Sequence, residues 1–235
     1  MYLISPSKVV RGNKAWQNSL DDIRKITNNP LVLGRSKATS KIRSSLFEDL
    51  TRNNFNPYEI SIQFDCCHED LENAYEFASQ KKCDAIIAAG GGKVLDTGKL
   101  LADSLSIPCI TVPLSASTCA GWTALSNIYT KKGQFIKDVN LRSCPELLIY
   151  DHSLIKTAPL NTLRSGIADS LAKWYESSIG MSSLDLLMQI VIPEFDSRII
   201  TVPCSFKEIK TLDNKLCSEI TTYKYDKNGI IWITK

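Results

Sequence analysis

Residues 88–99 read Ala-Ala-Gly-Gly-Gly-Lys-Val-Leu-Asp-Thr-Gly-Lys, and the apolar run 85–89 leads into them. A short apolar run is typical of a buried strand, and the residues behind the glycines have a helical pattern. Glycine lets the backbone approach a ligand closely, and the N–H groups at a helix N-terminus attract anions. The stretch therefore predicts a strand-to-helix turn that either cradles a phosphate or simply turns a tight corner. It differs from the ordinary dinucleotide fingerprint, because residues 93–96 contain no further glycine.

Outward from this turn, strand-like and helix-like patterns alternate over the first 150 residues. We expect strands near 8–11, 31–33, 58–64, 85–89, 107–112 and 147–150, and helices near 14–26, 35–52, 68–80 and 94–105. This alternation predicts an α/β fold, a Rossmann-like parallel sheet with helices on both faces. Ligands bind such sheets beyond the C-terminal ends of the strands. Three loops, at Gly34, 90–92 and 113–118, follow strand ends, and we expect them to share one edge of the sheet.

The chain is expected to have three parts, namely an α/β domain over 1–153, the start of an all-helical domain over 154–190, and a divergent tail over 191–235. One apolar helical face marks the second part: Leu160, Leu163, Ile167, Leu171 and Trp174. In the tail, two β-rich runs flank an Asn-Gly pair at 228–229, which is typical of a β-hairpin.

Composition narrows the class of protein. The formal net charge of +3 over 235 residues is too small, and its basic residues too scattered, to indicate a nucleic-acid surface. No apolar run approaches the length of a membrane span, and the N-terminus lacks the pattern of a signal peptide. The eight cysteines have no paired metal spacing, which favours reduced thiols. We therefore expect a cytoplasmic protein that binds neither nucleic acid nor membrane.

Four stretches, in this order along the chain, carry a family resemblance: 90–99, 113–118, 123–129 and 166–174. Over about residues 1–180 the sequence resembles the iron-containing alcohol dehydrogenase family, and within it the glycerol dehydrogenase branch. The resemblance implies a domain that binds NAD or NADP and a helical domain that helps to bind zinc or iron. It also implies an oxidoreductase that oxidises a small alcohol or polyol by hydride transfer.

The resemblance implies the cofactor contacts residue by residue. The residues that match the pyrophosphate turn are Gly91, Gly92 and Lys93, with Asp96 in the first turn of the helix. Those that match the nicotinamide side are Ser117, Thr123, Leu125 and Tyr129. An acidic residue in a first helical turn can also merely complement the helix dipole, which is the alternative for Asp96.

The loop after the second expected strand departs from the family. Glycerol dehydrogenases have an acidic residue there that binds the adenosine ribose, whereas this chain has Arg35, with Lys37 nearby. A carboxylate repels a 2′-phosphate, and guanidinium and ammonium groups attract one. We therefore predict a preference for NADP(H). The alternative is that both side chains are solvated charges at the start of a helix.

Asp169 aligns with the one carboxylate among the metal ligands of the family. The other two ligands are histidines on later helices, whereas this chain has only His68 and His152, and neither is at a ligand position. A catalytic metal normally has three protein ligands, so the ligand set of this chain is incomplete. The alternative for Asp169 is a position on a solvated helix face.

Cys119 stands where glycerol dehydrogenases have an aspartate near the substrate. A thiol cannot accept hydrogen bonds from vicinal hydroxyls as a carboxylate does, which argues against glycerol as the substrate. The alternative is that Cys119 is a catalytic cysteine, but the motif contains no nearby histidine to pair with it.

Three hypotheses follow for the function. The first is a metal-dependent, NAD(P)-dependent alcohol or polyol dehydrogenase. The second is a dinucleotide-binding remnant without catalytic activity. The third keeps the fold but changes the chemistry, as in phosphate-bearing polyol dehydrogenases or relatives of dehydroquinate synthase, which also use a metal and late histidines. A shortened helical domain would leave apolar surface uncovered on the helix near 160–178. We therefore expect either a homo-oligomer or a partner that covers this face.

Overall fold

The computed structural model describes residues 5–180, 187–190, 200–203, 223–225 and 231–233. The chain forms two compact units, Met1–Ser165 and Gly166–Lys235. Within the described residues, no helix combines the length and apolar character that crossing a bilayer requires.

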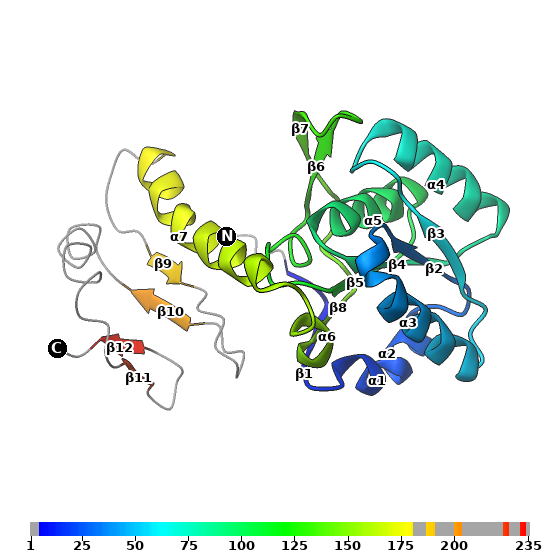
Figure 1. Cartoon of the computed structure of the whole chain (residues 1–235), viewed down its shortest axis with the longest axis horizontal. Helices are drawn as coiled ribbons and strands as arrows, with labels where there is room; N and C mark the ends of the chain where they lie inside the picture. Colours follow the sequence, from blue (N-terminus) through cyan, green and yellow to red (C-terminus); the bar gives the residue numbers. More distant parts are fainter. Residues whose placement is uncertain (1–4, 181–186, 191–199, 204–222, 226–230, 234–235) are drawn as a thin grey trace. The chain divides into compact units, whose positions relative to one another are not determined.

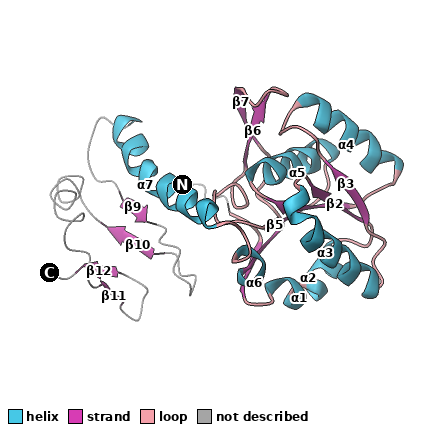
Figure 2. Ribbon diagram, viewed as in Figure 1, coloured by secondary structure: helices cyan, strands magenta, loops and turns pink. Residues whose placement is uncertain are grey.

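The first unit is built on a six-stranded parallel sheet (Figure 1 and Figure 2). Its strands, in chain order, are β1 (Lys8–Gly12), β2 (Pro30–Gly34), β3 (Tyr58–Ser61), β4 (Ala85–Gly90), β5 (Cys109–Pro113) and β8 (Leu147–Asp151). In space they lie in the order β1-β8-β5-β4-β2-β3, and every neighbouring pair is parallel. Every residue of β2, β4 and β5 is buried, as expected for strands that are covered on both faces. The predicted α/β fold is confirmed.

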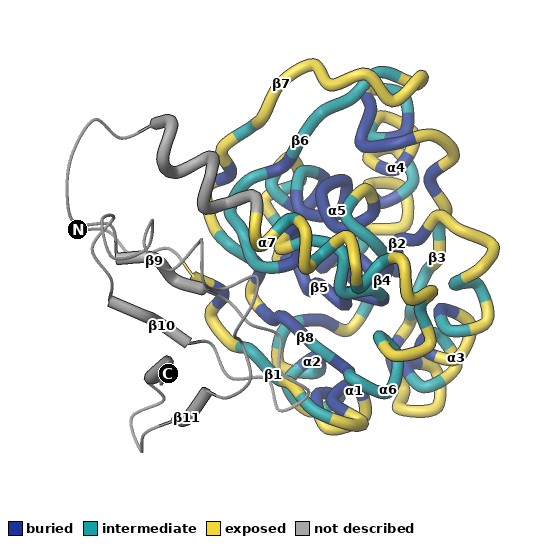
Figure 3. The backbone as a smooth tube through the Cα atoms, turned by 60° about the vertical axis from the view of Figure 1, so that its left-hand side comes forward, coloured by how far each residue is buried: buried dark blue, intermediate teal, exposed yellow. Residues whose placement is uncertain are grey.

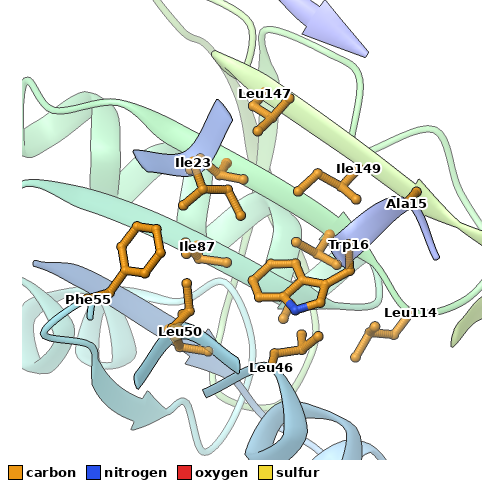
Figure 4. Close-up of a cluster of buried hydrophobic side chains, with 14 residues drawn as sticks. Ala15, Trp16, Ile23, Leu46, Leu50, Phe55, Ile87, Leu114, Leu147 and Ile149 are labelled. Carbon is orange, nitrogen blue, oxygen red and sulfur yellow. The ribbon is translucent and has the colours of Figure 1, made fainter. Parts of the chain in front are cut away.

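Helices cover both faces of this sheet. They are α1 (Ala15–Asn18), α2 (Leu20–Ile26), η1 (Lys37–Thr39), α3 (Ser40–Arg52), α4 (His68–Gln80), α5 (Gly92–Leu105) and α6 (His152–Ile155). Successive residues of β4 divide between two cores, because side chains alternate across a strand. Ile87 belongs to the cluster around Trp16 and Leu50, which Figure 4 shows, and Ile86 packs with Leu95 on the α5 side.

The predicted helix over 14–26 is two helices. α1 ends at Asn18 and α2 begins at Leu20, with the buried Ser19 between them. The Ser19 hydroxyl donates to the Ala15 carbonyl at 2.7 Å. A serine that bonds the preceding turn competes with the regular helical ladder, and this local bond accompanies the break.

A hairpin that the sequence analysis did not predict extends from the domain. β6 (Leu125–Tyr129) pairs with β7 (Phe135–Asn140) in antiparallel fashion, with an irregularity between Ile128 and Tyr129. β7 is almost entirely exposed, as Figure 3 shows. The rings of Tyr129 and Phe135 contact each other edge to face, with centroids 5.9 Å apart. The Lys-Lys-Gly turn at 131–133, with Gly133 at φ 77°, is the sequence signal for this hairpin.

The second unit contains most of α7 (Leu160–Gly180) and two short antiparallel pairs. β9 (Leu187–Ile190) pairs with β10 (Ile200–Pro203), and β11 (Tyr223–Tyr225) pairs with β12 (Ile231–Ile233). The rest of the tail predicted over 191–235, including the Asn-Gly pair, lies outside the described residues.

On α7, the side chains of Leu160, Ile167 and Leu171 are exposed, with relative accessibilities of 60%, 45% and 65%. The uncovered apolar surface expected on this helix is therefore present at these three positions. Self-association stays a prediction.

Candidate functional site

The carboxyl ends of β2, β4 and β5 lie at one edge of the sheet, because these strands are parallel and adjacent. They end at Gly34, Gly90 and Pro113, with Gly90 opposite Pro113 in the ladder. The N–H of Leu114 donates to the Gly90 carbonyl at 3.0 Å, which holds the β5 loop against the glycine turn. The prediction that the three loops share an edge is confirmed.

The N-terminus of α5 opens onto this edge. Its N-cap is Gly91, with φ −86° and ψ −175°, and no side chain caps the helix. The first N–H groups of a helix have no partner within the helix, so they remain available to an anion. A Cβ on Gly92 would lie 3.2 Å from Thr118 Cγ2, and one on Gly91 would meet only Ser115 Oγ, at 3.7 Å. The two glycines thus leave the backbone accessible between α5 and the β5 loop, where Ser115 Oγ also bonds Ser117 Oγ at 3.0 Å.

Lys93 follows this turn, and its side chain is engaged elsewhere in the site. The half-exposed ammonium forms an ion pair with the buried carboxylate of Asp65, in the loop between β3 and α4. The same carboxylate accepts the N–H of Cys66 at 2.8 Å. Lys93 therefore joins the glycine turn to the β3–α4 loop.

Asp96 is buried on α5, and the structure corrects its expected place. The helix begins at Gly92 rather than near residue 94, so its first turn contains no acidic residue and Asp96 lies in the second turn. The alternative role as a complement to the helix dipole is wrong for this reason. Burial raises the pKa of Asp96, and the ion pair with Lys99, 3.1 Å away, opposes that shift. The Ser126 hydroxyl donates to the Asp96 carbonyl at 3.0 Å, which ties β6 to the helix.

Lys99 joins two of the predicted nicotinamide-side residues to Asp96. Its ammonium contacts Asp96 and donates to the Thr123 carbonyl and hydroxyl, both at 3.1 Å, and to the Leu125 carbonyl. Tyr129, at the end of β6, donates its N–H to the Cys66 carbonyl at 2.8 Å. Burial raises the pKa of the Tyr129 phenol, and the negative charge of Asp96 adds to that shift. Sequence reasoning missed Lys99, although a lysine three residues after Asp96 on a largely apolar helix was a signal.

Arg35 is exposed in the loop that follows β2, and Lys37 is exposed at the start of η1. A residue that sequence reasoning missed, Arg43, organises this loop. Its side chain is buried on α3, donates to the Ser36 carbonyl at 3.0 Å, and crosses the position where a Cβ on Gly34 would lie. The absence of a side chain at Gly34 therefore allows the guanidinium to pass under the loop that carries Arg35.

Cys119 is exposed in the loop between β5 and β6, where the Trp122 N–H donates to its carbonyl at 2.9 Å. Burial, with a smaller contribution from Cys119, raises the pKa of Tyr150 near the end of β8 to about 12. His68 is exposed at the start of α4 and His152 begins α6, and the described part of the chain contains no hydrogen bond from either to Cys119.

Asp169 lies half-buried on α7, in the second unit. Among the residues that the structure describes, no three histidine, cysteine, aspartate or glutamate side chains are grouped so that they could hold a metal ion. The described residues therefore do not fit the metal centre that the family resemblance implies. The ligand role of Asp169 stays a prediction.

Several known proteins are similar to this chain. An uncharacterized oxidoreductase of Synechocystis sp. is 40% identical over 187 residues, covering 77% of this chain and 47% of that protein. The glycerol dehydrogenase of Pseudomonas putida is 30% identical over 173 residues, with coverages of 74% and 47%. The crystal structure of glycerol dehydrogenase from Schizosaccharomyces pombe superposes with a TM-score of 0.66 at 29% identity, over 74% of this chain and 44% of that one. The chain thus spans about half the length of the curated relatives it matches.

Two family models match different parts of the sequence. The CobN/Magnesium Chelatase model matches residues 157–235, which follow the part of the sequence that has the pattern of the first domain. The iron-containing alcohol dehydrogenase model matches residues 6–152, the whole of the six-stranded sheet with its glycine turn. With that match over more than half of its length, this chain belongs to the iron-containing alcohol dehydrogenase family.

Proposed function

We propose that residues 6–152 bind NAD(P) and form the dinucleotide half of an oxidoreductase that acts on a small alcohol or polyol. The observation that carries this proposal is the uncapped N-terminus of α5 behind Gly91 and Gly92, at the edge where β2, β4 and β5 end. A 14-residue helix supplies a substantial positive end, and the glycines leave room for a diphosphate beside its N–H groups.

Each part of the edge has a role in this proposal. The N–H groups that follow Gly91 bind the pyrophosphate, and Lys93, paired with Asp65, holds that turn against the β3–α4 loop. Ser117, Thr123, Leu125 and Tyr129 border the nicotinamide, and Asp96 joins that region to the glycine turn through its ion pair with Lys99. The bound dinucleotide supplies the hydride acceptor, and the protein orients it.

The 2′-phosphate of NADP would lie against the exposed Arg35 and Lys37 beyond the end of β2. Because a phosphate is bound more strongly by a guanidinium than a ribose hydroxyl is, this loop favours NADP(H) over NAD(H). Arg43 supports the preference indirectly, since it fixes the backbone of the loop through Ser36.

The names of the relatives support the substrate class. They include glycerol dehydrogenases of Pseudomonas putida and Escherichia coli and the glycolaldehyde reductase of Halobacterium salinarum. Glycerol and glycolaldehyde, the compounds in these names, are small hydroxylated molecules. The six cysteines within the described residues are all free thiols, which supports a reducing compartment such as the cytoplasm.

One observation favours a second candidate function, dinucleotide binding without catalysis by this chain. The described residues contain no group that could hold a metal, and both histidines of the sequence lie in the first unit. In this candidate function the described residues bind the dinucleotide and carry out no metal-assisted step.

The test is a titration of the purified 235-residue chain with NADH and NADPH, followed by the fluorescence of the bound nicotinamide. We expect saturable binding, with the tighter complex formed by NADPH. Gly92→Val is the matched variant, because the added side chain would occupy the space between α5 and Thr118. Absence of binding by the unmodified chain at millimolar dinucleotide would contradict both candidate functions.

A further inference from the structure

We propose that Lys99 is a positioning residue, which holds the nicotinamide half of the proposed dinucleotide site in place. This inference rests on the proposed function and deepens it. Nothing in the chemistry of the pyrophosphate turn requires a lysine seven residues further along α5. The requirement comes from the oxygen atoms that surround its ammonium group.

The ammonium of Lys99 is fully enclosed, since its side chain is only 1% exposed. Four oxygens surround it: Asp96 Oδ1, the Thr123 carbonyl and Thr123 Oγ1, each at 3.1 Å, and the Leu125 carbonyl. An ammonium has three N–H donors, so these oxygens use its whole capacity. Lys99 therefore has no donor left for a cofactor and acts through the residues that it binds.

Those residues come from two separate segments. Asp96 is on α5, and Thr123 and Leu125 are in the chain that enters β6. Two hydrogen bonds hold these two segments in place without Lys99. The Ser126 hydroxyl donates to the Asp96 carbonyl, and the Leu141 N–H donates to the Ala124 carbonyl. The fold therefore retains connections when the ammonium is removed, whereas the Asp96 carboxylate and the two loop carbonyls lose their common partner.

Loss of the ammonium has a defined consequence for Asp96. Burial already raises the pKa of this carboxyl group, and Lys99 is the largest influence that lowers it. An unpaired buried carboxylate takes up a proton or moves toward water. Either response changes the charge or the position of the group beside the nicotinamide, far from the adenosine end of the site.

The chain offers a conservative replacement. Lys99 also lines a cavity of about 330 Å³, together with Cys109, Arg142 and Cys144. The longer side chain of an arginine can extend into this space while it keeps a positive charge and several donors. Lys99→Arg is therefore the rescue variant for Lys99→Met.

The experiment compares two ligands on the full chain. Isothermal titration calorimetry measures NADPH, which contains the nicotinamide, and 2′-phospho-ADP-ribose, which lacks it. We expect Lys99→Met to weaken NADPH binding about tenfold or more, and to change the affinity for 2′-phospho-ADP-ribose less than about twofold. The emission of bound NADPH should shift toward that of the free cofactor. Lys99→Arg should restore most of the affinity.

Lys25→Met is the control, because Lys25 is a lysine on α2 with a 75% exposed side chain, and it should behave as the unmodified chain does. A melting curve of each variant identifies misfolding, and Lys99→Gln, which keeps an amide donor, replaces Lys99→Met where the latter does not fold. Equal losses for both ligands, or no loss for NADPH, would overturn the positioning role. Failure of the unmodified chain to bind either ligand would instead overturn the proposed function, and this inference with it.

Discussion

At the scale of single residues, the positive charge beyond β2 should decide which dinucleotide binds. Arg35 and Lys37 are exposed there, and Arg43 fixes the backbone between them through Ser36. We predict that Arg35→Asp weakens NADPH binding by about 1.5–3 kcal/mol, because a charge-assisted hydrogen bond is replaced by repulsion. NADH, which has no 2′-phosphate, should be affected much less. Dissociation constants for both cofactors measure this, and an unchanged ratio between them would remove the 2′-phosphate contact from the proposal.

The buried thiols predict how stability depends on pH. Burial raises the pKa of Cys66 from 9.0 to about 12, so the native state keeps this proton at a pH where the unfolded chain has lost it. The free energy of unfolding should therefore fall as the pH rises from about 9 toward 12. Cys66→Ala removes one such proton and should reduce the slope by at most about 1.4 kcal/mol per pH unit. Urea unfolding between pH 8 and pH 11 tests this, and Cys119→Ala, at an exposed position, is the control.

The sequence pattern predicted where this site lies, but not which side chains hold it together. The glycine turn could be placed from the sequence, because an apolar run, three glycines and a helical pattern are all local signals. The placement of Asp96 in the first helical turn was wrong, since the helix begins at Gly92 and its N-cap is Gly91. Lys99 could not be assigned, because its partners at Thr123 and Leu125 are more than twenty residues away and only the tertiary fold brings them to it.

At the scale of elements, the packing of α5 on β4 depends on Gly98, which lies outside the glycine turn. A Cβ on Gly98 would lie 2.4 Å from the Cβ of Ala88, so only a glycine lets the helix approach the strand this closely. We predict that Gly98→Ala destabilises the chain by about 1–3 kcal/mol, through displacement of the helix. Its melting temperature should fall by about 2–4 °C for each kcal/mol.

A compensating variant makes this prediction specific. Ala88→Gly removes the atom that the new methyl group would contact, so the double variant should regain part of the stability lost by Gly98→Ala. Ser104→Ala, at an exposed position of the same helix, controls for helix propensity and should change the stability by less than about 0.5 kcal/mol. An equally stable Gly98→Ala variant would contradict the close approach of α5 to β4.

The elements that could be predicted are those with an unbroken local pattern. β2, β4 and β5 are buried throughout and read as continuous apolar runs, so their pairing in a parallel sheet followed from the alternation with helices. The β6–β7 hairpin could not be recognised in the same way. Five of the six residues of β7 are exposed, and its strand is held by pairing with β6 rather than by an apolar face.

At the scale of the whole molecule, the family models and the sequence pattern both change at nearly the same residues. The iron-containing alcohol dehydrogenase model ends at residue 152, and the CobN/Magnesium Chelatase model begins at residue 157. The sequence pattern that predicts the first domain also ends close to this boundary. The metal centre could not be predicted from the first domain, because the family resemblance implies ligands in the helical domain, with Asp169 as one of them, and that role stays a prediction.

The last prediction concerns the activity of the chain as a whole. Its sequence contains two histidines, His68 and His152, and both are in the first unit. Among the described residues no three ligating side chains are grouped, whereas a catalytic zinc or ferrous iron normally requires three protein ligands. We therefore predict that the purified chain binds the dinucleotide but does not oxidise glycerol or propane-1,2-diol, whether zinc or ferrous iron is added or removed with a chelator. The absorbance of NAD(P)H at alkaline pH measures turnover, and a full-length glycerol dehydrogenase assayed in parallel is the positive control. Turnover that a chelator abolishes and a metal restores would instead show that the remaining ligands come from residues beyond those the structure describes, or from a second copy of the chain.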